Sequence, residues 1–146
     1  MEEKKIIILS INSEIGSSIA LNFINKKNIV IGTYNNKTKI VIELKKKGAI
    51  LYKLDLKNKK KVDVVAKKIL LKSKNWDYLV SATGSLEPIS SILKSNIDKW
   101  ENSIYINCLG QIRFLKNLLI RNKKKRKILF FAGGGTNNAV KNYSAY

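Results

Sequence analysis

Residues 6–16 read Ile6-Ile7-Ile8-Leu9-Ser10-Ile11-Asn12-Ser13-Glu14-Ile15-Gly16. The first four form a continuous, largely β-branched apolar run, which is typical of a strand buried on both faces of a parallel sheet. From Ile15 onward, apolar residues recur at helical spacing at Ile19, Phe23 and Ile24. The stretch therefore predicts a strand, a short turn and a helix.

The rest of the chain alternates in the same way. We expect further strands at 28–34, 49–54, 78–81 and 128–131, and further helices at 37–47, after a capping Asn58, and over about 97–121. The long helix is expected to turn one stripe inward, formed by Ile97, Trp100, Ile104, Leu109, Ile112, Leu115, Leu118 and Leu119. This alternation implies right-handed crossovers, so the sequence predicts an α/β fold with a doubly wound parallel sheet, helices on both faces, and a single domain over 1–146.

The composition excludes several kinds of site. The chain has no histidine and Cys108 is its only cysteine, which excludes an internal disulfide, a thiolate-cluster zinc site and histidine-based catalysis. We therefore expect no metal. No apolar run approaches the roughly 20 residues that cross a bilayer, and residues 1–5 do not lead into a signal peptide. We expect a cytoplasmic protein with no membrane partner.

The formal net charge of +19 would suit a protein that binds nucleic acid. However, the positive charge is nearly all lysine, with arginine only at Arg113, Arg121 and Arg126. Lysine, isoleucine and asparagine share A/T-rich codons, and proteins that read bases usually employ the arginine fork. We expect a solvated basic surface and no dedicated nucleic-acid binding, and keep a basic nucleic-acid-binding protein as the third of three functional alternatives.

In an open doubly wound sheet, ligands bind beyond the carboxyl ends of the strands, where the strand order reverses. The first such loop, Ser10 to Gly16, leads into a helix whose free backbone N–H groups would suit a pyrophosphate. Only Gly16 remains of the three glycines in a dinucleotide fingerprint. Taken alone, the loop fits either a dinucleotide site or a plain turn.

Across its whole length, the chain resembles the short-chain dehydrogenase/reductase family. Residues 9–16 lie where that family has Thr-Gly-x-x-x-Gly-Ile-Gly, with Ser10 and Glu14 in place of two glycines. Asp55-Leu56 resembles its Asp-hydrophobic pair that contacts adenine. Residues 81–84, Ser-Ala-Thr-Gly, match its Asn-Asn-Ala-Gly segment at the final glycine and in having small side chains.

Two further matches concern catalysis. Asn107 lies where the family has the asparagine that orders a proton-relay water, and residues 143–146 resemble the lead-in to Tyr-x-x-x-Lys, whose tyrosine would be Tyr146. Two alternatives remain open: Asp55 as a turn or capping aspartate, and Asn107 as a solvated or helix-bonded amide.

The resemblance implies a Rossmann-like sheet of about five strands in the order 3-2-1-4-5. It also implies reversible hydride transfer between a nicotinamide and a carbonyl or alcohol, with Tyr146 as the proton donor or acceptor. The implied catalytic residues are Tyr146 and Asn107, and the implied cofactor-binding residues are Ser10, Asn12, Ser13, Glu14, Ile15, Gly16, Tyr34, Asn35, Asp55, Leu56, Ala82, Thr83 and Gly84.

The chain departs from the family pattern near its end. The lysine partner of Tyr146 would fall at position 150, beyond residue 146, and the family's serine would fall near Ala132 or Gly133, neither of which has a hydroxyl. Thr136 is the nearest candidate. We therefore expect a C-terminally incomplete domain, a fragment of a longer enzyme, that is inactive as it stands and leaves its fifth strand as an exposed edge.

The end of the second strand bears on the cofactor. Residues 34–37 read Tyr-Asn-Asn-Lys and lack the acidic side chain of NAD-selective sites, which favours NADP(H) over NAD(H). The resemblance further implies a small-molecule carbonyl or alcohol substrate and, for a full-length protein, a homo-oligomer. Because the serine hydroxyl is missing, the second functional alternative is a non-catalytic dinucleotide-binding regulator.

Overall fold

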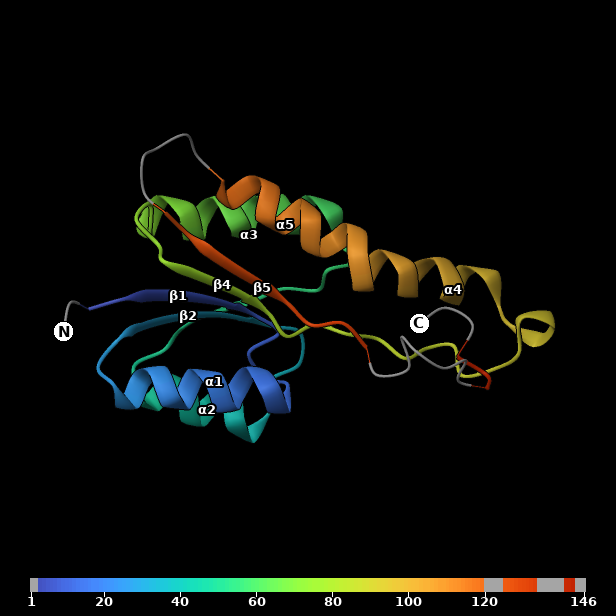
Figure 1. The fold of residues 1–146 in the computed structure, drawn as a ribbon, viewed down its shortest axis with the longest axis horizontal. Helices are drawn as coiled ribbons and strands as arrows, with labels where there is room; N and C mark the ends of the chain where they lie inside the picture. The colour runs from blue at the N-terminus through green and yellow to red at the C-terminus, as the bar shows by residue number, and fades with distance from the viewer. Residues whose placement is uncertain (1–2, 120–124, 134–140, 144–146) are drawn as a thin grey trace.

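The structure is a computed structural model that describes residues 3–119, 125–133 and 141–143, and its centre is a parallel sheet (Figure 1). The strands are β1 (Lys5–Leu9), β2 (Ile29–Tyr34), β3 (Ile50–Lys53), β4 (Tyr78–Ser81) and β5 (Lys127–Phe130), arranged in the order β3-β2-β1-β4-β5. Each neighbouring pair is parallel. The predicted fold class and strand order are confirmed, and the strand ends differ from the prediction by about one residue.

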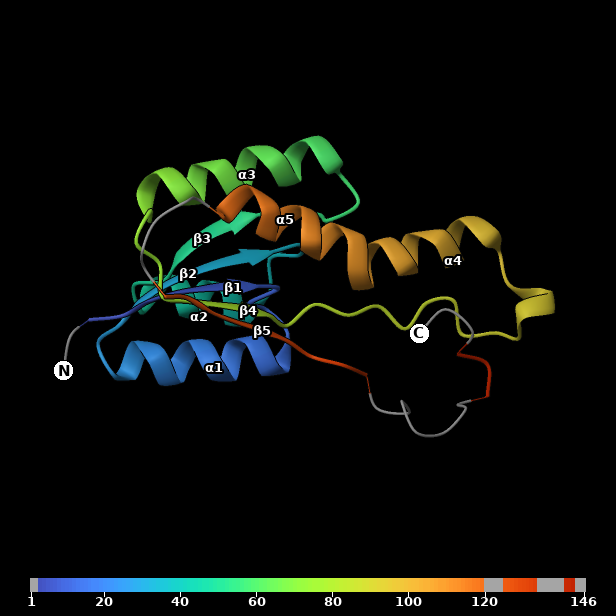
Figure 2. The same ribbon diagram turned by 45° about the horizontal axis from the view of Figure 1, so that its top comes forward.

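Helices cover both faces of the sheet (Figures 1 and 2). On one face lie α1 (Glu14–Asn25) and α2 (Lys39–Lys46), and on the other lie α3 (Lys59–Lys72) and α5 (Gly110–Leu118). A short 3₁₀ turn, η1 (Ile92–Lys94), precedes α4 (Ile97–Ile104), and a π-helical turn, η2 (Tyr105–Leu109), joins α4 to α5. None of the described helices is long and apolar enough to span a bilayer.

Strand β1 is the centre of the core. Its side chains alternate, so that Ile6 and Ile8 join the apolar cluster beneath α1 and α2, while Ile7 and Leu9 join the cluster beneath α3 and α5. All four are at most 2% exposed. Because full burial of such a side chain contributes about 1.5–3 kcal/mol, the run that predicts β1 also fixes it between two helical layers.

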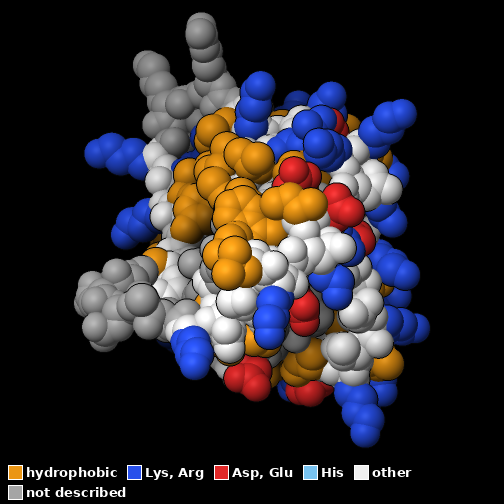
Figure 3. Space-filling model, turned by 90° about the vertical axis from the view of Figure 1, so that its right-hand side faces the viewer, with side chains coloured by type: hydrophobic (Ala, Val, Ile, Leu, Met, Phe, Trp, Pro, Cys, Tyr) orange, Lys and Arg blue, Asp and Glu red, His pale blue; other side chains and the backbone are white. Residues whose placement is uncertain are grey.

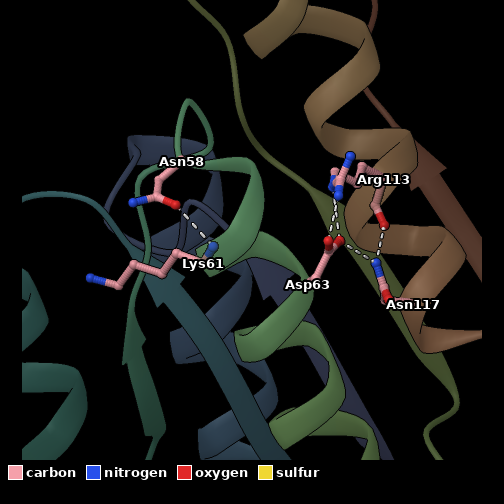
Figure 4. A network of polar contacts seen from close by, with 5 residues as sticks. All are labelled: Asn58, Lys61, Asp63, Arg113 and Asn117. Atoms are coloured by element: carbon pink, nitrogen blue, oxygen red, sulfur yellow. Dashed lines mark hydrogen bonds and ion pairs between the residues drawn. The ribbon is translucent and has the colours of Figure 1, made fainter.

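Helices α3 and α5 are joined by polar side chains at their surface (Figure 4). Asp63 of α3 accepts hydrogen bonds from Arg113, including one from Nε at 2.8 Å, and from Asn117 Nδ2 at 2.8 Å. The hydrogen bond from the Arg113 guanidinium holds the pKa of the Asp63 carboxyl below its ordinary value of 3.8. At the start of α3, Asn58 Oδ1 accepts from the Lys61 N–H at 2.9 Å, which confirms the predicted cap.

The long helix over 97–121 is the main error in the sequence-based prediction. The structure breaks it into α4, η2 and α5, ends α5 at Leu118, and leaves much of the expected inward stripe exposed: Ile97, Ile104, Leu109, Ile112 and Leu119. The positions that it buries are Ser103, Gly110, Gln111, Phe114 and Leu118.

The cause lies in the tertiary arrangement. Helix α4 projects past the carboxyl ends of the strands, so no sheet lies beneath it (Figures 1 and 2). The π-helical turn η2 departs from α-helical spacing and changes which residues of α5 face the sheet. On the side toward which α4 projects, apolar side chains gather at the surface (Figure 3). The large apolar residues exposed between β4 and α4 are Leu86, Ile89, Ile92 and Leu93.

Candidate functional site

A cleft of about 340 Å³ opens at the carboxyl edge of the sheet. Segments that follow β1, β2, β3 and β4 form it, together with η2. The lining residues are Ser10, Asn12, Ser13, Asn35, Asn36, Leu54, Asp55, Leu56, Ala82, Thr83, Gly84, Ser85 and Ile106. The cleft lies beside β1, where the strand order reverses, which is the position at which ligands of doubly wound sheets bind.

The cleft unites most of the predicted cofactor-binding residues, although their role in binding stays a prediction. Those that line it are Ser10, Asn12, Ser13, Asn35, Asp55, Leu56, Ala82, Thr83 and Gly84. The sequence reasoning missed four lining residues: Asn36, Leu54, Ser85 and Ile106. The first three adjoin predicted residues in the chain, so wider loop boundaries would have found them. Ile106 adjoins the predicted Asn107, and it reaches the cleft from η2.

Ser10, at a family glycine position, adopts a backbone conformation that favours glycine. Its φ is 60°, in the left-handed region that favours glycine. Two hydrogen bonds accompany this conformation: its N–H donates to Thr33 Oγ1 at 3.2 Å, and its hydroxyl pairs with Thr83 Oγ1 at 2.6 Å. Ser10 therefore holds a left-handed conformation at this turn without being glycine.

Gly16 is the glycine of this loop that the packing requires. A Cβ at this position would lie 2.5 Å from the Ser10 carbonyl oxygen and 2.9 Å from Ser13 Oγ. Ser13 caps α1, since its Oγ accepts from the Gly16 N–H at 3.0 Å. The absence of a side chain at Gly16 lets the loop fold back over the first turn of the helix.

Four predicted residues lie outside the wall of the cleft. Gly16 is buried beneath the loop, and Tyr34 packs against the cluster under α1 and α2. Glu14 is the exposed first residue of α1. Ile15 is 49% exposed, so it does not belong to the buried face of α1, where Gly16 and Ala20 are buried instead. The other three residues of the predicted stripe, Ile19, Phe23 and Ile24, pack against the cluster under α1 and α2, as expected.

The far end of the cleft, after β3, combines apolar walls with one carboxylate. Leu54 and Leu56 are buried, and Asp55 between them lines the cleft. Asp55 Oδ1 also accepts from the Lys57 N–H at 3.0 Å, so the turn-aspartate alternative describes its local geometry. Asp55 is the charged member of the lining set. An apolar slot with a single acceptor at its rim is suited to a flat heteroaromatic ring.

Asn107 holds the loop after β4. Its Oδ1 accepts from the Ser85 N–H at 2.7 Å, and its Nδ2 donates to the Ser85 carbonyl at 2.9 Å and to Ser103 Oγ at 3.3 Å. The alternative of a solvated amide is therefore wrong, because the amide reaches across 22 residues to fix another loop. The predicted relay role for Asn107 stays a prediction.

Gln111 is a structural residue of the site that sequence reasoning missed. Only 6% exposed, it accepts at Oε1 from Ser81 Oγ at 2.6 Å. Its Nε2 lies within hydrogen-bonding distance of the carbonyls of Ile106 and Asn107, both at 3.0 Å, and of Thr83 at 3.4 Å. A buried amide saturated in this way joins β4, its loop and η2 into one unit. The helical pattern gave no sign of it, because glutamine reads as a solvated residue.

The catalytic end of the site is described in part. Tyr146 and Thr136 lie outside the described residues. Tyr143 forms an isolated parallel bridge with Ser90, which brings the segment before Tyr146 beside the segment that follows the cleft. Ala132 and Gly133, where the family pattern would have a serine, follow β5 and carry no hydroxyl. Among the described residues there is no group of three or more histidine, cysteine, aspartate or glutamate side chains that would hold a metal ion.

Residues 10–146 match a protein-family model described as enoyl-(acyl carrier protein) reductase. The chain belongs to the short-chain dehydrogenase/reductase family. This is a family of oxidoreductases that bind NAD(P), and the match confirms the resemblance seen in the sequence motifs. No curated protein matches the chain at a comparable level.

Solved structures of short-chain dehydrogenases share the fold. One from Streptomyces avermitilis is 21% identical with a TM-score of 0.89, over 99% of this chain and 55% of that one. Another, from Salmonella enterica serovar Typhi, is 17% identical with a TM-score of 0.84, over 99% and 64%. An NADH-dependent reductase complexed with NAD is 11% identical with a TM-score of 0.85, over 99% and 66%. The chain thus spans a little over half to two thirds of these relatives.

The residues of the cleft fit two parts of the cofactor of a short-chain dehydrogenase/reductase, the adenine ring and the diphosphate. The slot at Leu54, Asp55 and Leu56 suits an adenine ring, and the glycine-like path of Ser10 with the close packing at Gly16 leaves the first turn of α1 open to a diphosphate. Glu14, at that first turn, departs from the family pattern and places a carboxylate beside the expected diphosphate position.

Proposed function

We propose that this chain is the cofactor-binding part of an NAD(P)-dependent oxidoreductase that transfers hydride between a nicotinamide and a small carbonyl or alcohol substrate. The observation that carries the proposal is that the loops after β1, β2, β3 and β4 line one cleft. The family match over residues 10–146 supports it. In this proposal, residues 1–146 act as one dinucleotide-binding domain. The longer protein is a homo-oligomer.

Within this proposal, the residues divide along the cleft. Leu54, Asp55 and Leu56 hold the adenine end, and the capped amino terminus of α1 at Ser13 holds the diphosphate. The nicotinamide supplies the hydride when it is bound. Tyr146 holds the proton that the substrate oxygen gains or loses, and Asn107 maintains the loop that faces that end.

We further propose that the cofactor is NADP(H) in preference to NAD(H). The residues at the end of β2 that line the cleft are Asn35 and Asn36, and neither would repel a 2′-phosphate. The test is to measure the dissociation constants of NADPH and NADH with the intact chain by nicotinamide fluorescence. Tighter binding of NADH would overturn the preference, and no binding of either would overturn the proposed function.

A single substitution sharpens this test. Asn36→Asp places a carboxylate at the end of β2, and we expect it to weaken NADPH binding about tenfold and to leave NADH binding within about threefold. Asn25→Asp makes the same change in charge at the exposed last residue of α1, at the other edge of the sheet, and serves as the control. Equal losses for both cofactors in Asn36→Asp would show that Asn36 does not face the ribose.

One observation favours a second function, a non-catalytic regulator that binds the dinucleotide. Neither Ala132 nor Gly133 supplies the hydroxyl that would bind a substrate oxygen. Such a regulator would bind NADPH as above and would not oxidise it in the presence of any carbonyl compound. Steady turnover of NADPH by the full-length protein with an aldehyde or ketone would exclude the regulator.

A further inference from the structure

Two of the positions at which this chain departs from the family pattern touch each other. Ser10 stands where the family has a glycine, and Thr83 stands where its Asn-Asn-Ala-Gly segment has an alanine. Their hydroxyl oxygens are 2.6 Å apart, although the residues are 73 positions apart in the chain. Glycine and alanine cannot form this contact, so the hydrogen bond belongs to the substituted pair.

Ser10 depends on this contact more than an ordinary serine would. At φ 60° its backbone is held in a conformation that glycine adopts without strain. The hydroxyl of Thr83 on one side and that of Thr33 on the other engage its side chain and its N–H. Loss of either contact removes an interaction that offsets the strain, whereas glycine at position 10 needs neither.

The pair lies at the centre of the cleft. Ser10 follows β1 and Thr83 follows the adjacent strand β4, and both residues line the cleft wall. The Thr83 carbonyl also lies 3.4 Å from Gln111 Nε2, which connects the pair to the buried amide network. Asp55 follows β3, which is two strands from β1 and three from β4. At a strand spacing of about 4.8 Å, Ser10 and Thr83 therefore lie roughly 10 Å and roughly 14 Å from the proposed adenine slot.

We propose that Ser10 and Thr83 act as one positioning unit, which holds the loop after β4 against the loop after β1 and sets the width of the cleft where the middle of a dinucleotide lies. This inference rests on the proposed function. In this unit Gln111 holds Thr83 in place through the Thr83 carbonyl, and Ser10 joins the loop after β1 to Thr83 through its hydroxyl. The pair replaces the glycine–alanine combination as a whole.

The test compares Ser10→Gly, Thr83→Ala, their double variant and the conservative Thr83→Ser in binding NADPH and AMP. We expect Thr83→Ala to weaken NADPH binding about tenfold and Ser10→Gly about threefold. AMP, which occupies the distant adenine slot, changes less than twofold in both. Thr83→Ser keeps the hydroxyl and binds as the original chain does. Thr38→Ala, at an exposed cap position without a side-chain hydrogen bond to its helix, is the control.

The double variant decides the matter. Because it restores the family's glycine and alanine together, it should bind NADPH within about threefold of the original chain and more tightly than Thr83→Ala alone. Losses that simply multiply in the double variant, or AMP affinity that falls in parallel with NADPH affinity, would overturn the proposal.

A chain that binds neither NADPH nor AMP would contradict the proposed function but would still test the pair. Its midpoint of thermal unfolding would then be compared across the same four variants. We expect Thr83→Ala to lower the midpoint and the double variant to recover most of the loss. Additive midpoint shifts would show that Ser10 and Thr83 are independent and would overturn the coupling.

Discussion

The loop that follows β1 and the loop that follows β4 line the same cleft, yet they are held in different ways. The first is held largely by its own neighbours: Ser13 caps α1 three residues before Gly16, and Gly16 packs under the Ser10 carbonyl. The second is held by η2, through two hydrogen bonds between the Ser85 backbone and the Asn107 side chain, 22 residues apart in the chain: the Ser85 N–H donates to Asn107 Oδ1, and Asn107 Nδ2 donates to the Ser85 carbonyl.

This difference separates loop conformations that depend on neighbouring residues from those that depend on distant ones. A turn closed by a cap and a glycine forms from contacts within a few residues, so its conformation can be inferred from residue types. A loop held by a distant amide has no such signal, since its conformation depends on where α4, η2 and α5 settle against α3. The Ser10–Thr83 hydrogen bond is the direct contact between the two loops.

The largest expected effect contrasts two glycines, one in each loop. Gly16→Ala places a Cβ 2.5 Å from a backbone carbonyl that cannot move without opening the loop. We expect a loss of about 3 kcal/mol in the free energy of unfolding. Gly84→Ala meets no atom within 4 Å and should change stability by less than about 0.5 kcal/mol. Urea denaturation followed by circular dichroism measures both, and equal losses would contradict the difference in packing.

The next prediction concerns the amide that holds the second loop. Asn107→Ala leaves the Ser85 N–H without its acceptor and leaves the Ser85 carbonyl with the Ser103 hydroxyl as its side-chain donor. We expect the free energy of unfolding to fall by about 2 kcal/mol. NADPH binding should weaken at least tenfold because the loop lines the cleft. Asn102→Ala, at an exposed position of α4, is the matched control. If Asn107→Ala behaved like that control in both measurements, the loop would have to be held in another way.

A smaller effect is expected at the start of α1. Glu14→Gln removes a negative charge from the first turn of the helix, which costs about 0.5 kcal/mol of stability. The same change removes repulsion of the proposed diphosphate, so NADPH affinity should rise severalfold at low salt. Glu43→Gln, an exposed glutamate of α2, provides the comparison. Unchanged affinity in Glu14→Gln would place the diphosphate away from this turn.

The smallest effect concerns the half-buried ion pair that joins α5 to α3. Since the Arg113 hydrogen bond lowers the pKa of Asp63 below 3.8 in the folded state, the pair stabilises the fold above that pH. The stabilisation is lost as the pH falls through the lowered pKa. Asp63→Asn should therefore be slightly less stable than the original chain at pH 7, and this difference should be smaller at about pH 2. Thermal unfolding at both values measures the difference, and a gap of the same size in acid would exclude this linkage.

The candidate site was predictable where it follows strands. Parallel strands end at a common edge, which predicts where a ligand would bind, and the resemblance to the family motifs named Ser10, Asp55 and Thr83 at that edge. Ile106 lies in η2 and Gln111 in α5, and the sequence predicts both segments as parts of one long helix. The apolar residues Leu109 and Ile112 indicated a buried face that the structure leaves exposed, so neither Ile106 nor Gln111 was expected at the site.

The sequence by itself determined the α/β class, the parallel sheet, the edge that carries the cleft and the family, because short β-branched runs, caps and motif spacing act over a few residues. The tertiary structure alone decided the exposure of Ile15 on α1, the break at η2, the exposed face of α4 and the contact between Ser10 and Thr83. These features depend on contacts between segments that are distant in the chain. The residue type at one position does not predict such contacts, because several faces of a helix can be similarly apolar and tertiary packing decides which of them is buried.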